Sequence, residues 1–118
     1  MSLQTIEQQI ALKALKISEK CNEDQARYYK RMPALIVSCG LIQTLAFIQT
    51  KKDVKINGKQ LVDNLLQNMQ KPVDNFSKLL ADADTLRSAT TEIMSLLQWI
   101  NRFNDAKPKS DKTDNKKD

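Results

Sequence analysis

Five basic residues have the spacing of a phosphate-binding edge on a helix. Counted at about 100° per residue along one continuous helix, they fall within an arc of about 60°. They are Lys13, Lys16, Lys20, Arg27 and Arg31. Like charges along one edge repel each other unless something negative lies against them, and a row of Lys and Arg suits a phosphate backbone. The alternative is an ordinary solvated face, because acidic residues are interleaved with the basic ones.

Three further lysines extend this basic surface. Lys30 lies between the two arginines, and Lys51 and Lys52 follow the next apolar stretch. Residues 13–59 carry ten Lys and Arg against four Asp and Glu, whereas residues 60–104 carry four against five. The net charge of +5 is therefore concentrated in the first half of the chain, which indicates a polyanionic partner there.

Few residues are available for catalysis. The chain has no histidine, so the commonest general base and zinc ligand are missing. Asp82 and Asp84 could hold a metal ion, but carboxylates before a helix are more often caps. Cys21 and Cys39 lack metal-site spacing and are predicted to be buried, reduced thiols. We therefore expect no enzymatic activity, no cofactor and no metal site.

Aromatic residues offer two further binding hypotheses. Tyr28 and Tyr29 adjoin the basic residues, so one of them could stack on a base, although packing of Tyr28 in the core is the preferred interpretation. Trp99 is either a partner contact or a core residue.

The composition predicts an all-α fold that positions these side chains. Among 118 residues only two are glycine and 5% are aromatic, whereas strong helix formers are abundant. We expect one helical bundle over residues 1–104 and a disordered, charged tail over 105–118. No apolar run is long enough for a membrane span and no signal peptide is evident, which predicts a cytoplasmic protein.

The apolar periodicity predicts where the helices lie. A long first helix is expected from residue 3 to about 32, with Ser2 or Thr5 as its cap, and Thr5 and Gln8 fit a capping box. The alternative is a second helix that begins at Asn22. Pro33 is expected to start a buried central helix that runs to Gln49. Further helices are expected over 59–70, 74–81 and 84–104, with a conceivable short strand at Val54–Ile56.

Gly40 lies inside the expected central helix. Its presence there requires an explanation, because glycine lowers helix stability by about 1 kcal/mol relative to alanine. Close approach of a neighbouring helix is the predicted reason.

The stretch from Tyr28 to Phe47 resembles the signature of the small subunit of the type III-B CRISPR–Cas effector, the Cmr complex. The matching positions are Tyr28 or Tyr29, Met32–Pro33, Ala34–Val37, Gly40–Leu41, Gln43 and Leu45–Ala46–Phe47. Trp99, Ile100, Arg102 and Phe103 match the ending of that family, and Thr5–Gln9 fits its start. The likeness covers residues 3–105 and departs at Cys39, where the family often has a polar Asn.

The resemblance implies a non-catalytic subunit of a helical ribonucleoprotein. Its implied partners are guide and target RNA, the repeated backbone subunit, the large polymerase-like subunit and further copies of itself. The basic residues named above would then contact RNA. Two alternatives are a protein-only helical adaptor and a metal-dependent nuclease built on Asp82 and Asp84.

Overall fold

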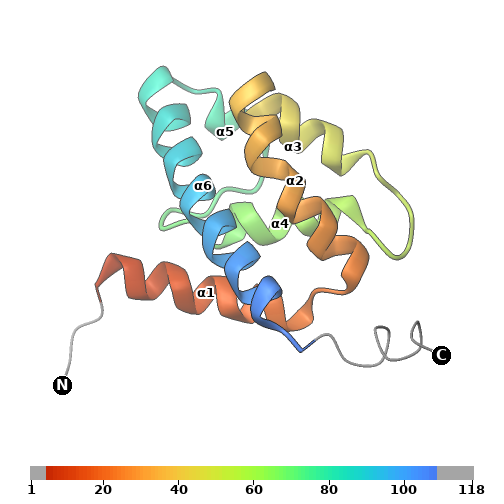
Figure 1. Cartoon of the computed structure of the whole chain (residues 1–118). Helices are drawn as coiled ribbons and strands as arrows, with labels where there is room; N and C mark the ends of the chain where they lie inside the picture. Colours follow the sequence, from red (N-terminus) through yellow and green to blue (C-terminus); the bar gives the residue numbers. More distant parts are fainter. Residues whose placement is uncertain (1–4, 109–118) are drawn as a thin grey trace.

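The computed structural model describes residues 5–108, which form six helices and contain no strand. The helices are α1 (Ile6–Lys20), α2 (Glu23–Cys39), α3 (Leu41–Gln49), α4 (Gly58–Gln67), α5 (Phe76–Leu79) and α6 (Ala83–Ala106). The longest helix, α6, packs against α1 and α2 and also contacts α4 and α5 (Figure 1). The predicted all-α fold is confirmed.

The prediction of one long first helix is wrong, because the chain leaves the helical path after Lys20. Cys21 is extended, and Asn22 begins α2 with a capping box. The Asn22 side chain accepts from the Gln25 amide at 2.8 Å, and the Gln25 side chain accepts from the Asn22 amide at 3.2 Å. Local capping therefore outweighs the apolar periodicity that continues across the break. The same kind of box, between Thr5 and Gln8, begins α1 as predicted.

Pro33 does not begin a helix but lies inside α2. A proline in a helix has no N–H for the carbonyl four residues earlier, here that of Tyr29. The side-chain amide of Asn101 in α6 donates to that carbonyl at 3.2 Å. The missing donor is thus replaced from another helix, and α2 continues to Cys39.

Gly40 separates α2 from α3, which divides the expected central helix into two. Its backbone has φ +89° and ψ 162°, a region that is essentially restricted to glycine. A Cβ atom there would meet no other heavy atom within 4 Å. The predicted close approach is therefore wrong, and the backbone conformation explains the glycine.

The later helices lie near their predicted positions. The loop before α4 contains a turn rather than the conceivable strand at Val54–Ile56, and Asn57, with φ +48°, caps α4. The last helix continues to Ala106, so it includes the first two residues of the expected tail. Lys107 caps α6 and Pro108 follows it, and residues 109–118 of the expected tail lie outside the described residues.

The core draws on all six helices. Its largest fully buried side chains include Tyr29, Met32, Leu45, Leu65 and Ile100. No helix in the described part of the chain combines the length and hydrophobicity that a bilayer span requires.

Candidate nucleic-acid interface

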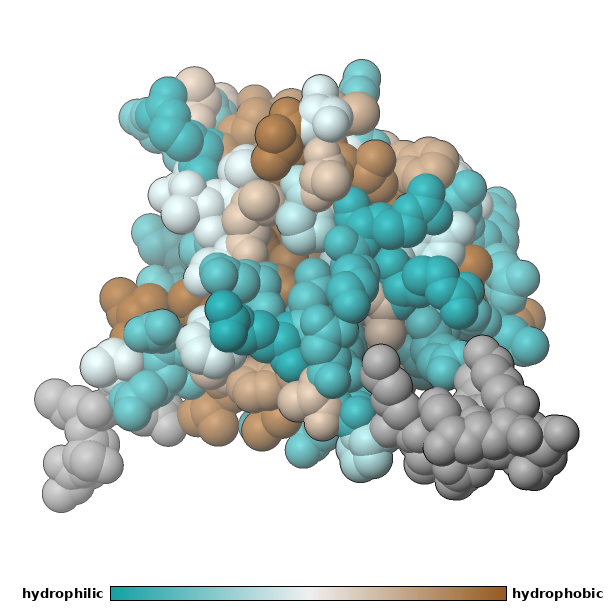
Figure 2. All heavy atoms as spheres, in the orientation of Figure 1, coloured by the Kyte–Doolittle hydropathy of each residue, from teal (hydrophilic) through white to brown (hydrophobic). Residues whose placement is uncertain are grey.

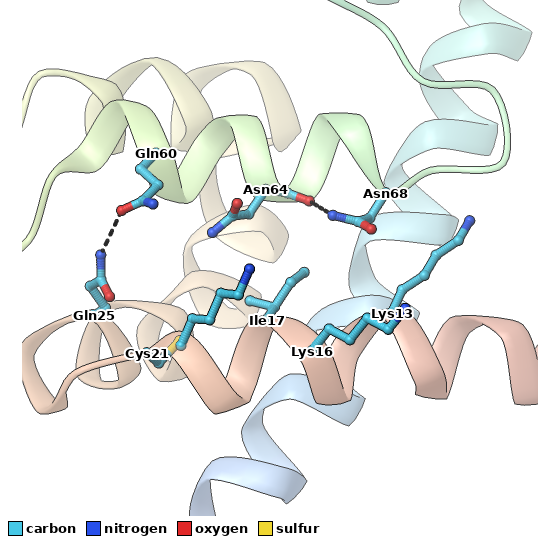
Figure 3. A pocket seen from close by; sticks show the side chains of 9 residues that line it. Lys13, Lys16, Ile17, Cys21, Gln25, Gln60, Asn64 and Asn68 are labelled. Atoms are coloured by element: carbon cyan, nitrogen blue, oxygen red, sulfur yellow. Dashed lines mark hydrogen bonds between the residues drawn. The ribbon is translucent and has the colours of Figure 1, made fainter.

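A polar groove lies between α1 and α4, and three of the predicted basic residues line it. Lys13, Lys16 and Lys20 follow each other at spacings of three and four, so they share one edge of α1. Ala14, Ile17 and Ser18 form the buried face beside this edge. Because that face is buried in the bundle, the lysines are held at its border, toward α4 (Figure 3).

The opposite wall of the groove is a row of side-chain amides that the sequence analysis did not single out. Gln60 and Asn64 in α4 and the C-cap residue Asn68 are four residues apart and lie next to the buried leucines of this helix. Gln25 closes one end by donating to the Gln60 side chain at 3.3 Å and to the Ile56 carbonyl at 3.1 Å. One sequence signal could have indicated this amide row, namely the four-residue spacing of the amides beside the Leu61–Leu65 stripe.

The groove is positively charged. Its cavity volume is about 270 Å³, and among residues 5–108 no carboxylate lines it. Ile17 and the half-buried Cys21 complete the lining. Burial raises the pKa of the Cys21 thiol, against smaller lowering effects of Asn104 and Lys107, which favours the neutral thiol. Three ammonium groups therefore face a neutral, hydrogen-bonding wall.

The three basic residues on α2 lie outside the lining of this groove. Arg27 pairs with Asp24 at 3.2 Å, and Lys30 pairs with Asp105 at 2.7 Å. The Arg31 guanidinium lies 5.3 Å from the centre of the Tyr28 ring. These side chains are exposed, so each is accessible to solvent while it holds its internal partner. The single arc of five basic residues is not formed, because α1 and α2 are separate helices.

The remaining two predicted lysines lie in the loop after α3. The Lys51 ammonium lies 4.3 Å from the centre of the Phe47 ring. Lys52 borders a shallow depression with Ala46 and Phe76. Neither lysine lines the α1–α4 groove, so the structure divides the eight predicted residues into three groups.

The two candidate metal-binding aspartates have local structural partners. Asp82 caps α6 by accepting from the Thr85 amide at 2.7 Å, and this bond lowers the pKa of its carboxyl group. Asp84 pairs with Arg87 at 2.8 Å. Within residues 5–108 no group of three potential metal-ligating side chains was found. The cap interpretation of Asp82 is confirmed.

The cysteine predictions need one correction, and a second tyrosine joins the core. Tyr28 is partly buried and packs against the core, whereas Tyr29 is fully buried and donates to the Leu61 carbonyl at 3.3 Å. Cys39 is exposed rather than buried, because it ends α2 beside Gly40. Trp99 is partly buried and stacks on Phe103 at a centroid distance of 5.7 Å.

The fold and the groove define a class of small all-helical proteins with a basic, amide-lined groove on one face. The chain belongs to the family described as CRISPR-associated protein (Cas_Cmr5), whose model matches residues 4–107. This is the small-subunit family of the type III-B Cmr complex. Searches of curated proteins and of solved structures found no match.

Family membership defines the biological setting. The protein is a subunit of the Cmr complex in CRISPR defence, and other subunits of that complex are its partners. The resemblance found in the sequence, from residue 3 to residue 105, is thereby confirmed.

Proposed function

We propose that this protein is a non-catalytic RNA-binding scaffold subunit that helps to hold the guide RNA–target RNA duplex in the cytoplasmic Cmr ribonucleoprotein. The observation that carries the proposal is the α1–α4 groove, where three lysines lie together and no carboxylate of the described residues lines the wall. A phosphate backbone offers the regularly spaced negative charges that such a row of ammonium groups binds.

The mode of binding follows from the chemistry of these groups. Lysine ammonium groups contact phosphates as point charges and carry no base preference of their own. Binding is therefore expected to be largely independent of base sequence and to weaken strongly with added salt.

The basic residues of α2 add a second contact region. Exposed ion pairs such as Arg27–Asp24 and Lys30–Asp105 contribute at most about 1 kcal/mol. An RNA phosphate can therefore replace either carboxylate at small cost. We assign Arg27, Lys30 and Arg31 to this region, and Lys51 and Lys52 to a third, peripheral one.

Exposed hydrophobic side chains support the protein contacts of a scaffold. Figure 2 shows hydrophobic residues gathered at the end of the molecule where α2, α3 and α5 lie, and again along α1. Val37 is 78% exposed, Leu80 60% and Ile6 60%. We assign these surfaces to contacts with neighbouring copies of the chain, with the repeated backbone subunit and with the large subunit.

These same surfaces favour one alternative function, a helical adaptor that binds only proteins. A salt titration of RNA binding separates the two functions. Full-length protein and the assembled complex are titrated with a fluorescently labelled RNA at salt concentrations from 50 to about 200 mM, the range over which phosphate contacts weaken measurably.

The scaffold proposal predicts that log K falls linearly with log salt concentration. Absence of affinity at the lowest salt concentration, for the protein alone and in the complex, would establish the adaptor instead. RNA cleavage in Mg²⁺ or Mn²⁺ that the substitution Asp82→Asn abolishes would overturn the non-catalytic assignment.

A further inference from the structure

The amide row of α4 has hydrogen-bonding capacity that phosphate binding does not use. Phosphate oxygens only accept hydrogen bonds, and the three lysines of α1 already supply the donors. Gln60, Asn64 and Asn68 nevertheless face the same groove from its other side (Figure 3).

The internal hydrogen bonds determine which amide atoms face an incoming ligand. Asn64 Nδ2 donates to the Tyr29 hydroxyl oxygen at 3.2 Å, and Asn68 Nδ2 donates to the Asn64 main-chain carbonyl at 2.6 Å. Each nitrogen atom thus uses one of its two N–H donors within the protein. Within residues 5–108 no hydrogen bond to either side-chain oxygen is present, so Asn64 Oδ1 and Asn68 Oδ1 are two available acceptors.

The Tyr29 hydroxyl fixes the orientation of the first amide. Its proton goes to the Leu61 carbonyl at 3.3 Å, so toward Asn64 the phenol oxygen is an acceptor and must face Nδ2. The opposite end of that amide is therefore an oxygen. The orientation of the Asn64 amide thus follows from its hydrogen-bond network.

A ligand that fits lysines on one wall and acceptors on the other carries both negative charge and hydroxyl donors. The sugar–phosphate backbone of RNA has both, because each ribose bears a 2′-hydroxyl, which can donate a hydrogen bond. The DNA backbone has the same phosphates and lacks that donor.

We propose that the α1–α4 groove binds the RNA backbone with its phosphates on the lysines and its 2′-hydroxyls on Asn64 Oδ1 and Asn68 Oδ1, and thereby selects RNA over DNA. The inference rests on the proposed RNA-binding function and assigns the atoms that distinguish the two nucleic acids.

The test compares two oligonucleotides of identical base sequence, one of ribonucleotides and one of 2′-deoxyribonucleotides, by fluorescence anisotropy with the full chain at low salt. Wild-type protein should bind the RNA more tightly. The substitution Asn68→Ala should weaken RNA binding about two- to tenfold, the range for one lost hydrogen bond, and leave DNA binding unchanged. Gln98→Ala, which removes an exposed amide on α6, is the matched control and should change neither affinity.

A second variant, Asn64→Ala, removes the other acceptor and also the contact with Tyr29. To detect a folding defect, each variant is compared with wild type by circular dichroism and thermal melting. For a folded Asn64→Ala protein the same selective loss of RNA affinity is expected.

The outcomes separate this inference from the proposed function. Equal affinity of wild-type protein for both oligonucleotides would overturn the selection of RNA and leave RNA binding intact. An equal loss of both affinities in folded Asn68→Ala would also overturn it. Binding of neither oligonucleotide, by the protein alone or assembled, would overturn the proposed function itself.

Discussion

The side-chain amide of Asn101 in α6 donates to the main-chain carbonyl of Tyr29 in α2, 3.2 Å away. Pro33 leaves this carbonyl without its usual helical donor, so one side chain makes a proline acceptable inside α2. The substitute donor comes from a residue 72 positions away in the sequence.

The first prediction tests this relationship with a double-mutant cycle. Asn101→Leu should lower the free energy of unfolding by about 1–3 kcal/mol, because it leaves a buried carbonyl unsatisfied. In a Pro33→Ala background, where residue 33 regains an N–H, the same substitution should cost clearly less. Urea unfolding of the four proteins measures both values. Equal costs in the two backgrounds would show that Asn101 does not compensate for the proline.

The second prediction concerns the two glycines, which are required for different reasons. Gly40→Ala should destabilise by about 1–3 kcal/mol through backbone strain alone, because φ is +89° and space is available. Gly58→Ala should be worse, because its Cβ would lie 1.9 Å from the Ile48 carbonyl oxygen. Thermal melting ranks the two variants, and a milder effect at Gly58 would contradict the packing of α4 against the end of α3.

The third prediction is a pH dependence that arises from Tyr29. Burial raises the pKa of this phenol above its ordinary value of 10.0, so the folded protein retains the proton that the unfolded chain releases. The stabilisation is complete below pH 10 and is lost at higher pH, at about 1.4 kcal/mol per pH unit, until Tyr29 ionises in the folded state.

Two variants isolate the contribution of Tyr29 from other groups that titrate at high pH. The free energy of unfolding of Tyr28→Phe is compared at pH 9 and pH 11 with that of the double variant Tyr28→Phe/Tyr29→Phe. The single variant should lose more stability between these pH values. An identical loss in both would show that Tyr29 ionises without cost in the folded protein.

Local sequence signals predicted much of the fold. Apolar spacing placed α6 to within two residues, and the Thr5–Gln8 box marked the start of α1. The sequence favours a continuous helix across Lys20, because the apolar stripe continues in register from α1 into α2. The place of Pro33 inside α2 is not predictable locally, because its compensation by Asn101 is a tertiary contact.

The candidate site could likewise be predicted only in part from the sequence. The lysines of α1 could be predicted, since their spacing on one helix is sufficient to align them. The amides of α4 could not, because their relevance depends on α4 lying opposite α1. The grouping of Lys13 to Arg31 into one arc was wrong for the same reason that the continuous helix was wrong.

The central claim is that the lysines of α1 bind RNA phosphates, and the salt dependence of RNA affinity tests it most directly. Lys13→Gln/Lys16→Gln is compared with Lys71→Gln/Lys78→Gln, which removes the same charge from a different depression, between the loop after α4, α5 and the start of α6. Anisotropy titrations with single-stranded RNA at several salt concentrations give the slope of log K against log salt concentration. If both lysines contact phosphates, the groove variant should bind more weakly and its slope should be shallower by about 1.4, whereas the control keeps the wild-type slope. A groove variant with the slope of the wild type, or one that loses no more affinity than the control, would contradict the assignment of RNA binding to this groove.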